Sequence, residues 1–255
     1  MARPPRPSAG LQTLAGSLGF GGKTHIVRGR ALITGASGAL GGSVVRRFLA
    51  GGERVVAVYG SAARDLAGLA PGDRLAVRQA DLTSTAEVER LFAEELAGET
   101  APVVAHLVGA FRPGRLREMS DEDWSLLLRV NLESTFRVAR ACARCFERAG
   151  GGALVVVSSP AALLGEAGMG AYAAAKAGTL RLVESLAREV APCGGRANAV
   201  LPGTMDTPAN RRAMPAADPA TWVTTKAVAE VIYYLTTPAA AAVNGAAVRV
   251  PGPSL

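Results

Sequence analysis

The sequence predicts one α/β domain built on a doubly wound parallel sheet of about seven strands. From about Arg30 onward, short apolar runs alternate with longer stretches of helical periodicity. Several of these runs are apolar without alternation, which is typical of strands that are covered on both faces. A length of 255 residues suits one large domain better than two small ones. We therefore place a single domain at residues 26–255, after an N-terminal tail at 1–25.

The expected strands are seven short runs rich in β-branched and aliphatic residues: Arg30–Thr34, Arg54–Tyr59, Arg74–Ala80, Val103–Val108, Ala153–Ser158, Arg196–Leu201 and Ala246–Val250. Helical segments with recognisable beginnings lie between them. Ser84 and Glu87 have capping-box spacing, and Ser120 precedes three acids that suit the start of a helix running to about Arg148. Ala171–Val190 is a third such helix. This alternation predicts a parallel sheet with its ligand site at the carboxyl ends of the strands.

The excess positive charge of the chain lies near its N-terminus. The formal net charge is +7, and residues 1–30 contain five basic residues and no acid. The rest of the chain is therefore close to neutral and does not predict a nucleic-acid-binding face. The proline-containing tail favours disorder, with an organelle transit peptide as the alternative. We expect no membrane span, because no run of 18 apolar residues lacks a charge.

The chain has three cysteines, Cys142, Cys145 and Cys193. An odd, low count argues against a disulfide framework and favours a reducing compartment, so we expect a cytoplasmic protein. Cys142 and Cys145 form a C-x-x-C pattern inside a helical stretch, without a second pair of ligands. Because a metal site needs about four ligands, we expect these two thiols to pack in the core and no metal to bind.

A glycine-rich loop follows the first expected strand. It runs from Thr34 to Gly41 with the sequence TGASGALG and leads into a helical pattern. Glycines let the backbone turn sharply and approach a pyrophosphate, and the helix N-terminus then offers it free N–H groups. The position of the loop predicts a dinucleotide-binding fold of the Rossmann type, with these residues at the cofactor: Thr34, Gly35, Ser37, Gly38 and Leu40.

The end of the second expected strand bears on the choice between NAD and NADP. An acid there would bind the ribose 2′-hydroxyl of NAD and repel the 2′-phosphate of NADP. The strand ends at Tyr59, Gly60 and Ser61, with no acid before Asp65. Gly60 and Ser61 leave room for a phosphate that Arg64 could reach. NADP(H) is therefore slightly favoured over NAD(H), the alternative being that Arg64 is a solvated surface charge.

Two further positions are expected at the cofactor. Asp81 and Leu82 come just after the third expected strand, where they could contact the adenine. Asp81 could equally be a turn residue or the cap of the next helix. Gly109 closes the fourth expected strand, where a side chain would obstruct the cofactor.

Tyr172 and Lys176 are separated by one helical turn, so both project from the same face. An ordinary tyrosine pKa of about 10 is too high for proton exchange near pH 7, and lowering it by three units needs about 4 kcal/mol. The Lys176 ammonium and the positive nicotinamide of an oxidised cofactor would both favour the tyrosinate. Ser159, 13 residues before Tyr172, could hold a substrate carbonyl oxygen. Together with the glycine loop, these residues predict a nicotinamide-dependent oxidoreductase.

From about Gly29 to Pro251 the chain resembles the short-chain dehydrogenase/reductase family. The residues that carry the resemblance follow the family's order and spacing: the loop Thr34–Gly41, Asp81, Asn131, Ser159, Tyr172, Lys176 and Pro202-Gly203. The resemblance implies that Tyr172 is the general acid/base and that Ser159 orients the substrate carbonyl. It also implies that Lys176 binds the nicotinamide ribose and lowers the pKa of the tyrosine.

The same resemblance assigns Asn131 to a water of the proton relay. It places three further residues along the nicotinamide: Pro202, Gly203 and Thr207. The chain departs from the family pattern at two places. Ala39 stands where the family has glycine, and His106–Gly109 stands where the family has Asn-Asn-Ala-Gly. We expect His106 to be a packed, hydrogen-bonded residue and not a catalyst.

A narrower resemblance points to dihydropteridine reductases. It involves the loop and a later segment: Gly38–Gly41, Asp206–Arg211, Met214, Pro215, Asp218 and Trp222. Those enzymes lack the serine and the asparagine of the full catalytic set, so a carbonyl/alcohol couple fits Ser159 and Asn131 better than a quinonoid pterin does.

Three functions are therefore carried forward. The first is a ketoreductase or alcohol dehydrogenase that acts on a small-molecule carbonyl substrate, such as a 3-oxoacyl compound. The second is a dihydropteridine-type reductase. The third is a non-catalytic NAD(P)-sensing regulator, against which the intact Ser159, Tyr172 and Lys176 argue. The family resemblance further implies a homodimer or homotetramer, paired through the helices that hold Asn131 and Tyr172.

Overall fold

A computed structural model describes residues 29–61, 66 and 72–253. Its main sheet has seven strands in the order β3-β2-β1-β4-β5-β6-β9, and all neighbours are parallel. The strands are β1 (Ala31–Thr34), β2 (Val55–Tyr59), β3 (Leu75–Gln79), β4 (Val103–His106), β5 (Gly152–Val157), β6 (Gly195–Pro202) and β9 (Ala247–Val250). The predicted fold and all seven strands are confirmed. The predictions for the tail at 1–25 and for Arg64 lie outside the described residues.

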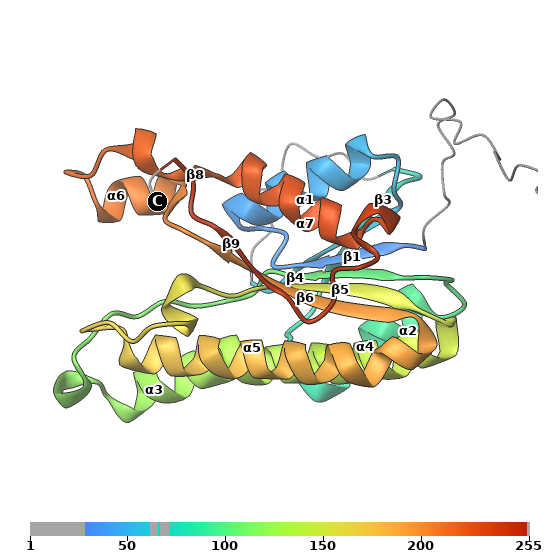
Figure 1. Cartoon of the computed structure of the whole chain (residues 1–255), viewed down its shortest axis with the longest axis horizontal. Helices are drawn as coiled ribbons and strands as arrows, with labels where there is room; N and C mark the ends of the chain where they lie inside the picture. The colour runs from blue at the N-terminus through green and yellow to red at the C-terminus, as the bar shows by residue number, and fades with distance from the viewer. Residues whose placement is uncertain (1–28, 62–65, 67–71, 254–255) are drawn as a thin grey trace, which may run out of the picture.

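Helices cover both faces of this sheet, as Figure 1 shows. α1 (Ala39–Ala50) and α7 (Thr225–Thr236) lie on one face. α2 (Thr85–Leu96), α4 (Ser134–Ala149) and α5 (Gly170–Val190) lie on the other. Each face has its own apolar core, because a strand covered on both sides must present apolar groups in both directions. This double cover explains the unbroken apolar runs in the sequence.

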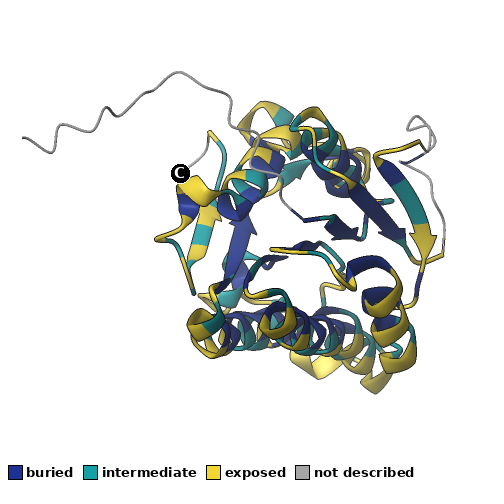
Figure 2. Cartoon of the chain, turned by 90° about the vertical axis from the view of Figure 1, so that its right-hand side faces the viewer, coloured by how far each residue is buried: buried dark blue, intermediate teal, exposed yellow. Residues whose placement is uncertain are grey.

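The strand order reverses direction at β1 and β4. The chain builds outward from β1 through β2 to β3, then returns to β4 and continues through β5 to β6 on the other side. Loops at the carboxyl ends of β1 and β4 therefore diverge, and such a switch point is where ligands bind in open α/β sheets. The strands at this point are fully buried, whereas the edge strands β3 and β9 are partly exposed (Figure 2).

The helix expected to begin after Ser120 has an unexpected interior. As predicted, a helix begins after Ser120: α3 (Asp121–Leu127), which Ser120 caps by accepting a hydrogen bond from the Asp123 amide. A π-helical turn, η3 (Leu128–Glu133), then joins α3 to α4. Single π-turns inside helices are frequent at functional sites, and this one carries Asn131.

Two local details also differ from the expectations. Ser84 accepts a hydrogen bond from the Glu87 amide, but the Glu87 carboxylate binds the Asp81 amide instead of returning to Ser84. The structure also contains a second, two-stranded sheet of β7 (Met205–Asp206) and β8 (Val223–Thr224), with α6 (Pro208–Ala213) between them in the chain. Strands of two residues are too short to show a periodicity.

Cys142 and Cys145 are both buried in α4, with free thiols. Burial raises the pKa of each thiol, most strongly that of Cys142, so both are unreactive packing groups. Among the residues that the structure describes, no group of three or more acids, cysteines and histidines could hold a metal. No helix in the same part of the chain is long and apolar enough to cross a membrane.

Candidate active site

The glycine loop between β1 and α1 requires glycine at two positions, one because of its backbone conformation and one because of lack of space. Gly35 adopts a left-handed conformation with φ of 68°. A Cβ on Gly41 would lie 2.3 Å from the Gly35 carbonyl oxygen. Gly38 precedes α1, and a Cβ there would meet only ordinary contacts. The loop is therefore built for a close turn onto the N-terminus of α1, which suits an anionic group.

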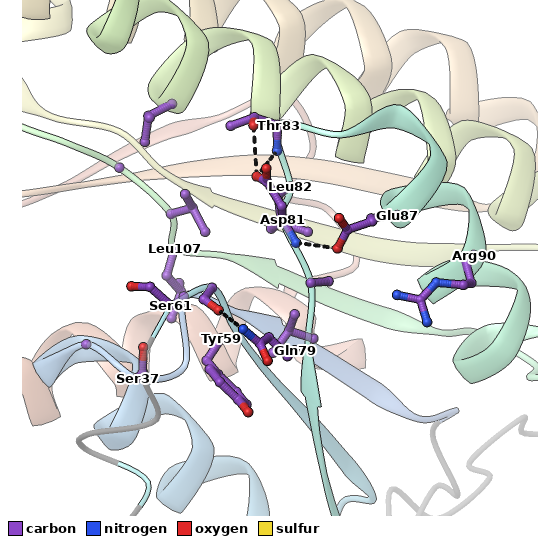
Figure 3. Close-up of a pocket in the computed structure, with 18 residues that line it drawn as sticks. Ser37, Tyr59, Ser61, Gln79, Asp81, Leu82, Thr83, Glu87, Arg90 and Leu107 are labelled. Atoms are coloured by element: carbon purple, nitrogen blue, oxygen red, sulfur yellow. Dashed lines mark hydrogen bonds between the residues drawn. The ribbon is translucent and has the colours of Figure 1, made fainter.

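A cavity of about 1050 Å³ opens at the carboxyl ends of β1 to β4. Its size suits a large ligand. Nine of the predicted cofactor residues line it: Gly35, Ser37, Gly38, Tyr59, Gly60, Ser61, Asp81, Leu82 and Gly109 (Figure 3). The other predicted cofactor residues are not among its lining residues: Thr34, Leu40, Tyr172, Lys176, Pro202, Gly203 and Thr207.

Four polar residues that the sequence reasoning did not assign also line the cavity: Gln79, Thr83, Glu87 and Arg90. The Gln79 amide nitrogen donates to the Gly60 carbonyl at 2.9 Å, which ties the end of β3 to the loop after β2. Gln79 was interpreted only as part of the third strand, and Glu87 only as part of a helix start. These four residues are distant in sequence from the glycine loop, so nothing in the sequence indicated that they line the same cavity.

Asp81 combines the two roles that the sequence left open. Its carboxylate accepts hydrogen bonds from the amide and the hydroxyl of Thr83, both at 2.8 Å, as a turn residue does. Its side chain also lines the cavity, and its amide donates to Glu87 at 2.8 Å. Figure 3 shows these three side chains grouped at one end of the cavity.

The candidate catalytic side chains lie at the end of β5 and the start of α5. Ser159 is the N-cap of a short 3₁₀ turn, η4 (Pro160–Ala162), and its hydroxyl accepts from the Ala161 amide. Burial raises the pKa of Tyr172, while the nearby Ser159 hydroxyl acts in the opposite direction. Ser159 therefore lies close to Tyr172. Phe111 packs edge-on against the Tyr172 ring at 5.0 Å between centroids.

Lys176 is a buried cation beside this pair. Its Nζ donates to the Val157 carbonyl at 3.0 Å and lies 5.9 Å from the centroid of the Tyr172 ring. Burial lowers the pKa of Lys176 to about 8. Lys176 is not among the causes that shift the pKa of Tyr172, so the expected lowering by the ammonium is not seen in the chain by itself.

Asn131 fixes the backbone that follows β4. Its side-chain oxygen accepts from the Ala110 amide at 3.1 Å, and its side-chain nitrogen donates to the Ala110 carbonyl at 2.9 Å. Its own carbonyl receives the hydroxyls of Thr135 and Thr179. A Cβ on Gly109 would lie 2.9 Å from the Asn131 side-chain oxygen and 3.2 Å from the Lys176 Nζ. Glycine at 109 thus makes room for the side chains of Asn131 and Lys176.

The residues expected along the nicotinamide lie at and after the end of β6, whose last residue is Pro202. A Cβ on Gly203 would lie 2.6 Å from the Pro251 carbonyl oxygen, so the glycine allows two chain segments to approach. Thr207 is buried and caps α6 by accepting from the Asn210 amide at 3.1 Å. These contacts give Gly203 and Thr207 structural roles at the carboxyl end of the sheet.

His106 is fully buried at the end of β4 and hydrogen-bonded at both ring nitrogens, as expected. Nδ1 lies 2.8 Å from the Thr34 hydroxyl and Nε2 lies 3.3 Å from the Ser134 hydroxyl. Burial, assisted by the nearby Lys176, lowers the pKa of His106 to about 3. The imidazole is therefore neutral at physiological pH.

A glycine loop at the switch point of a parallel sheet, a large cleft beside it and a Ser-Tyr-Lys set define a dinucleotide-dependent oxidoreductase. Comparison with known proteins agrees with this class. A family model described as enoyl-(acyl carrier protein) reductase matches residues 35–252. The chain belongs to the short-chain dehydrogenase/reductase family of NAD(P)-dependent oxidoreductases.

Individual relatives support the same assignment. The chain is 36% identical to (3R)-3-hydroxyacyl-CoA dehydrogenase of Mus musculus over 71% of its own length and 76% of that protein. It is 32% identical to the 3-oxoacyl-acyl-carrier-protein reductase FabG of Escherichia coli K12, over 71% and 75%. A crystal structure of a short-chain oxidoreductase from Burkholderia thailandensis superposes with a TM-score of 0.78 at 32% identity, covering 88% of this chain and 91% of that one.

Proposed function

We propose that the protein is an NAD(P)H-dependent ketoreductase or alcohol dehydrogenase with Tyr172 as its general acid/base. The observation that carries this proposal is the placement of Ser159 and the buried Lys176 beside Tyr172, with the Lys176 Nζ 5.9 Å from the centroid of the tyrosine ring. A structural tyrosine would need neither partner. A non-catalytic sensor of the cofactor would likewise have no use for a proton donor at this place.

The residues of the cleft fit a dinucleotide. Gly35 and Gly41 leave no room for a side chain, and a Cβ on Gly60 would meet open space. The loop Gly35–Gly38 with the N-terminus of α1 would hold the pyrophosphate, and Asp81 and Leu82 would contact the adenine. When bound, the nicotinamide supplies a hydride to a carbonyl carbon or accepts one from an alcohol. The absence of an acid at Tyr59–Ser61 favours NADP(H).

Each catalytic side chain then has one task. Ser159 donates a hydrogen bond to the substrate oxygen and orients it. Tyr172 donates its proton to that oxygen in reduction and removes it in oxidation. Lys176 would bind the nicotinamide ribose, and the segment held by Asn131 would carry the water of the proton relay.

The pKa of Tyr172 must fall for this chemistry, because burial by itself raises it. An ammonium near the tyrosinate favours the charged form, and each pKa unit of lowering needs about 1.4 kcal/mol. A protonated Lys176 would contribute to this lowering. The positive charge of an oxidised nicotinamide would supply the rest when the enzyme works toward oxidation.

The substrate class follows from the named relatives and the geometry together. A 3-oxoacyl thioester, or the corresponding 3-hydroxyacyl compound, is the first substrate to test, because two relatives carry these names. The narrower likeness to dihydropteridine reductases makes a quinonoid pterin the competing substrate. We also propose that the chain assembles as a homodimer or homotetramer in the cytoplasm.

One experiment separates these substrates. Purified protein is mixed with NADPH and either a 3-oxoacyl thioester or quinonoid dihydropterin, and absorbance at 340 nm is followed. Tyr172→Phe should lower turnover of the thioester about 10³-fold, and Ser159→Ala about 10²–10³-fold, with little change in NADPH affinity. A pterin spreads the incoming electrons over a ring and does not need Ser159. Efficient pterin turnover that survives Ser159→Ala, with slow ketone turnover, would refute the ketoreductase assignment.

A further inference from the structure

His106 connects two parts of the site that are distant in sequence. On one side is Thr34, the last residue of β1, which directly precedes Gly35 of the cofactor loop. On the other side is Ser134, the first residue of α4, which directly follows the π-turn of Asn131. All three side chains are fully buried, so no solvent competes for their hydrogen bonds.

The hydrogens in this cluster can be assigned from its geometry. The Ser134 hydroxyl donates to the Val130 carbonyl within η3, so its single hydrogen is already used. Ser134 can therefore only accept from His106, which places the proton on Nε2. Nδ1 is then a bare acceptor, and the Thr34 hydroxyl at 2.8 Å must donate to it. The chain of donors runs in one direction, from Thr34 through His106 and Ser134 to Val130.

Both ends of this chain border the cofactor cleft. Gly35 and Val130 line the cavity directly. The Val130 carbonyl lies in the turn whose next residue, Asn131, holds both polar backbone groups of Ala110. A displacement at either end would therefore be transmitted to the cofactor loop or to the loop beside Lys176.

We propose that His106 is a positioning residue that couples the cofactor loop to the Asn131 turn through this one-way hydrogen-bond chain. The inference rests on the proposed function, since it gives Asn131 a part in catalysis. It extends that function to a residue that touches neither cofactor nor substrate. The imidazole is suited to this task because its two nitrogens lie on opposite sides of a rigid ring, one toward β1 and one toward α4.

Asparagine, the family's usual residue here, cannot make both contacts. Its polar atoms sit where Nδ1 lies and fall short of Nε2, whereas the longer glutamine can place an N–H group near Nε2. His106→Asn should therefore keep the Thr34 contact and lose Ser134, and His106→Gln should do the reverse. The two variants therefore test the two ends of the hydrogen-bond chain independently.

The kinetic test measures the NADPH dissociation constant and kcat for each variant. His106→Asn should lower kcat about tenfold and leave NADPH affinity within about twofold, with Ser134→Ala giving the same pattern. His106→Gln should weaken NADPH binding about tenfold and change kcat less. Thr236→Val, which removes a buried hydroxyl in α7 outside the cavity, is the matched control and should alter neither. If both His106 variants only melt earlier, with kcat and affinity unchanged, the residue is merely structural and the proposal fails.

A spectroscopic test needs no activity. The chain has two histidines, His25 and His106, so ¹⁵N-histidine labelling of the His25→Gln variant leaves one imidazole to observe. His106 should remain neutral from pH 5 to 8, with the proton on Nε2. A proton on Nδ1, or titration near pH 6.5, would contradict the proposed hydrogen-bond chain even if the enzyme proves inactive on ketones. If the wild type does not reduce ketones, the proposed function is refuted, but a neutral His106 with its proton on Nε2 would still support the hydrogen-bond chain.

Discussion

At the scale of single residues, several positions are decided by neighbours that are remote in sequence. Gly109 is an example: the sequence assigned it to cofactor access, but the atoms a side chain would meet belong to Asn131 and Lys176. Tyr172 is another, since one helical turn to Lys176 suggested a lowered pKa, whereas burial raises it. Spacing along a helix gives proximity, and it does not give the degree of burial.

Tyr59 allows a direct test of cofactor preference. It lies at the end of β2 and lines the cleft. In Tyr59→Asp, the new carboxylate should repel a 2′-phosphate and weaken NADPH binding more than NADH binding, by about 1–3 kcal/mol. Fluorescence titration with both cofactors measures the difference, and Tyr59→Asn controls for loss of the ring. Equal losses for the two cofactors would show that residue 59 does not face the ribose phosphate.

His106 also predicts how stability depends on pH. Its pKa is about 3 in the folded protein and about 6.5 in an unfolded chain. Between these pKa values the unfolded state binds a proton that the folded state excludes. The contribution of the neutral His106 to the free energy of unfolding is therefore fully present above pH 6.5 and is lost as the pH falls below that value.

From pH 7.5 to 5.5 the loss attributable to His106 should be about 1.4 kcal/mol. Urea unfolding at the two pH values measures it, and His106→Gln should remove that part of the dependence. Identical pH dependence in wild type and variant would contradict the assigned pKa.

At the scale of elements, β6 and the end of α7 are joined by one guanidinium. Arg196 donates to the carbonyls of Leu235, Thr237, Ala240 and Val243 at 2.8 to 3.2 Å. The carbonyls of Leu235 and Thr237 lie where α7 ends, and those of Ala240 and Val243 lie in the segment that follows. The last turn of a helix leaves its carbonyl groups without helical partners. The Arg196 guanidinium therefore binds carbonyl groups at the end of α7 and connects this helix to β6.

Arg196→Lys should consequently destabilise the fold by about 1–3 kcal/mol, because an ammonium cannot reach the same set of acceptors. Chemical denaturation gives the value. Arg181→Lys, at an exposed residue paired with Glu184, is the control and should change stability by less than about 0.5 kcal/mol. If Arg196→Lys also changed the free energy of unfolding by less than about 0.5 kcal/mol, water would be able to replace the guanidinium without loss of stability.

The order and type of the main elements could be predicted because periodicity is a local property. Apolar runs such as Ala153–Ser158 correspond to strands within a residue or two. The glycine loop and nine cavity residues followed from the same pattern together with the family resemblance. Gln79, Glu87 and Arg90 could not be found this way, because β3 and α2 meet the glycine loop only through the folding of the sheet. The π-turn was also missed, since one extra residue leaves no mark in an apolar pattern.

At the scale of the whole molecule, stability should be graded from the middle of the sheet to its edges. β1 and β4 are fully buried and β5 nearly so, between two apolar cores. β9 alternates between exposed and partly exposed residues, and β3 becomes exposed toward its end. The amides of the central strands should therefore open only with global unfolding, and those of β3 and β9 by smaller local openings.

Hydrogen exchange followed by mass spectrometry checks this gradient. Peptides covering β1, β4 and β5 should exchange slowest, and bound NADPH should slow the loop after β1 more than β9. Equal protection of β9 and β4 would point to cover on that edge by another chain, as in an oligomer.

The π-turn at Leu128–Glu133 has a geometric consequence for the long helical segment Asp121–Ala149. An α-helix advances about 100° per residue, so one additional residue in a turn rotates everything before it by that angle relative to everything after it. Trp124 in α3 and Phe136 in α4 therefore face directions that a single helical wheel would misplace. Deletion of one residue from the turn would restore the ordinary phase and swing Trp124 around the axis. The residues before and after the turn therefore follow two helical patterns that differ in rotational phase by about 100°.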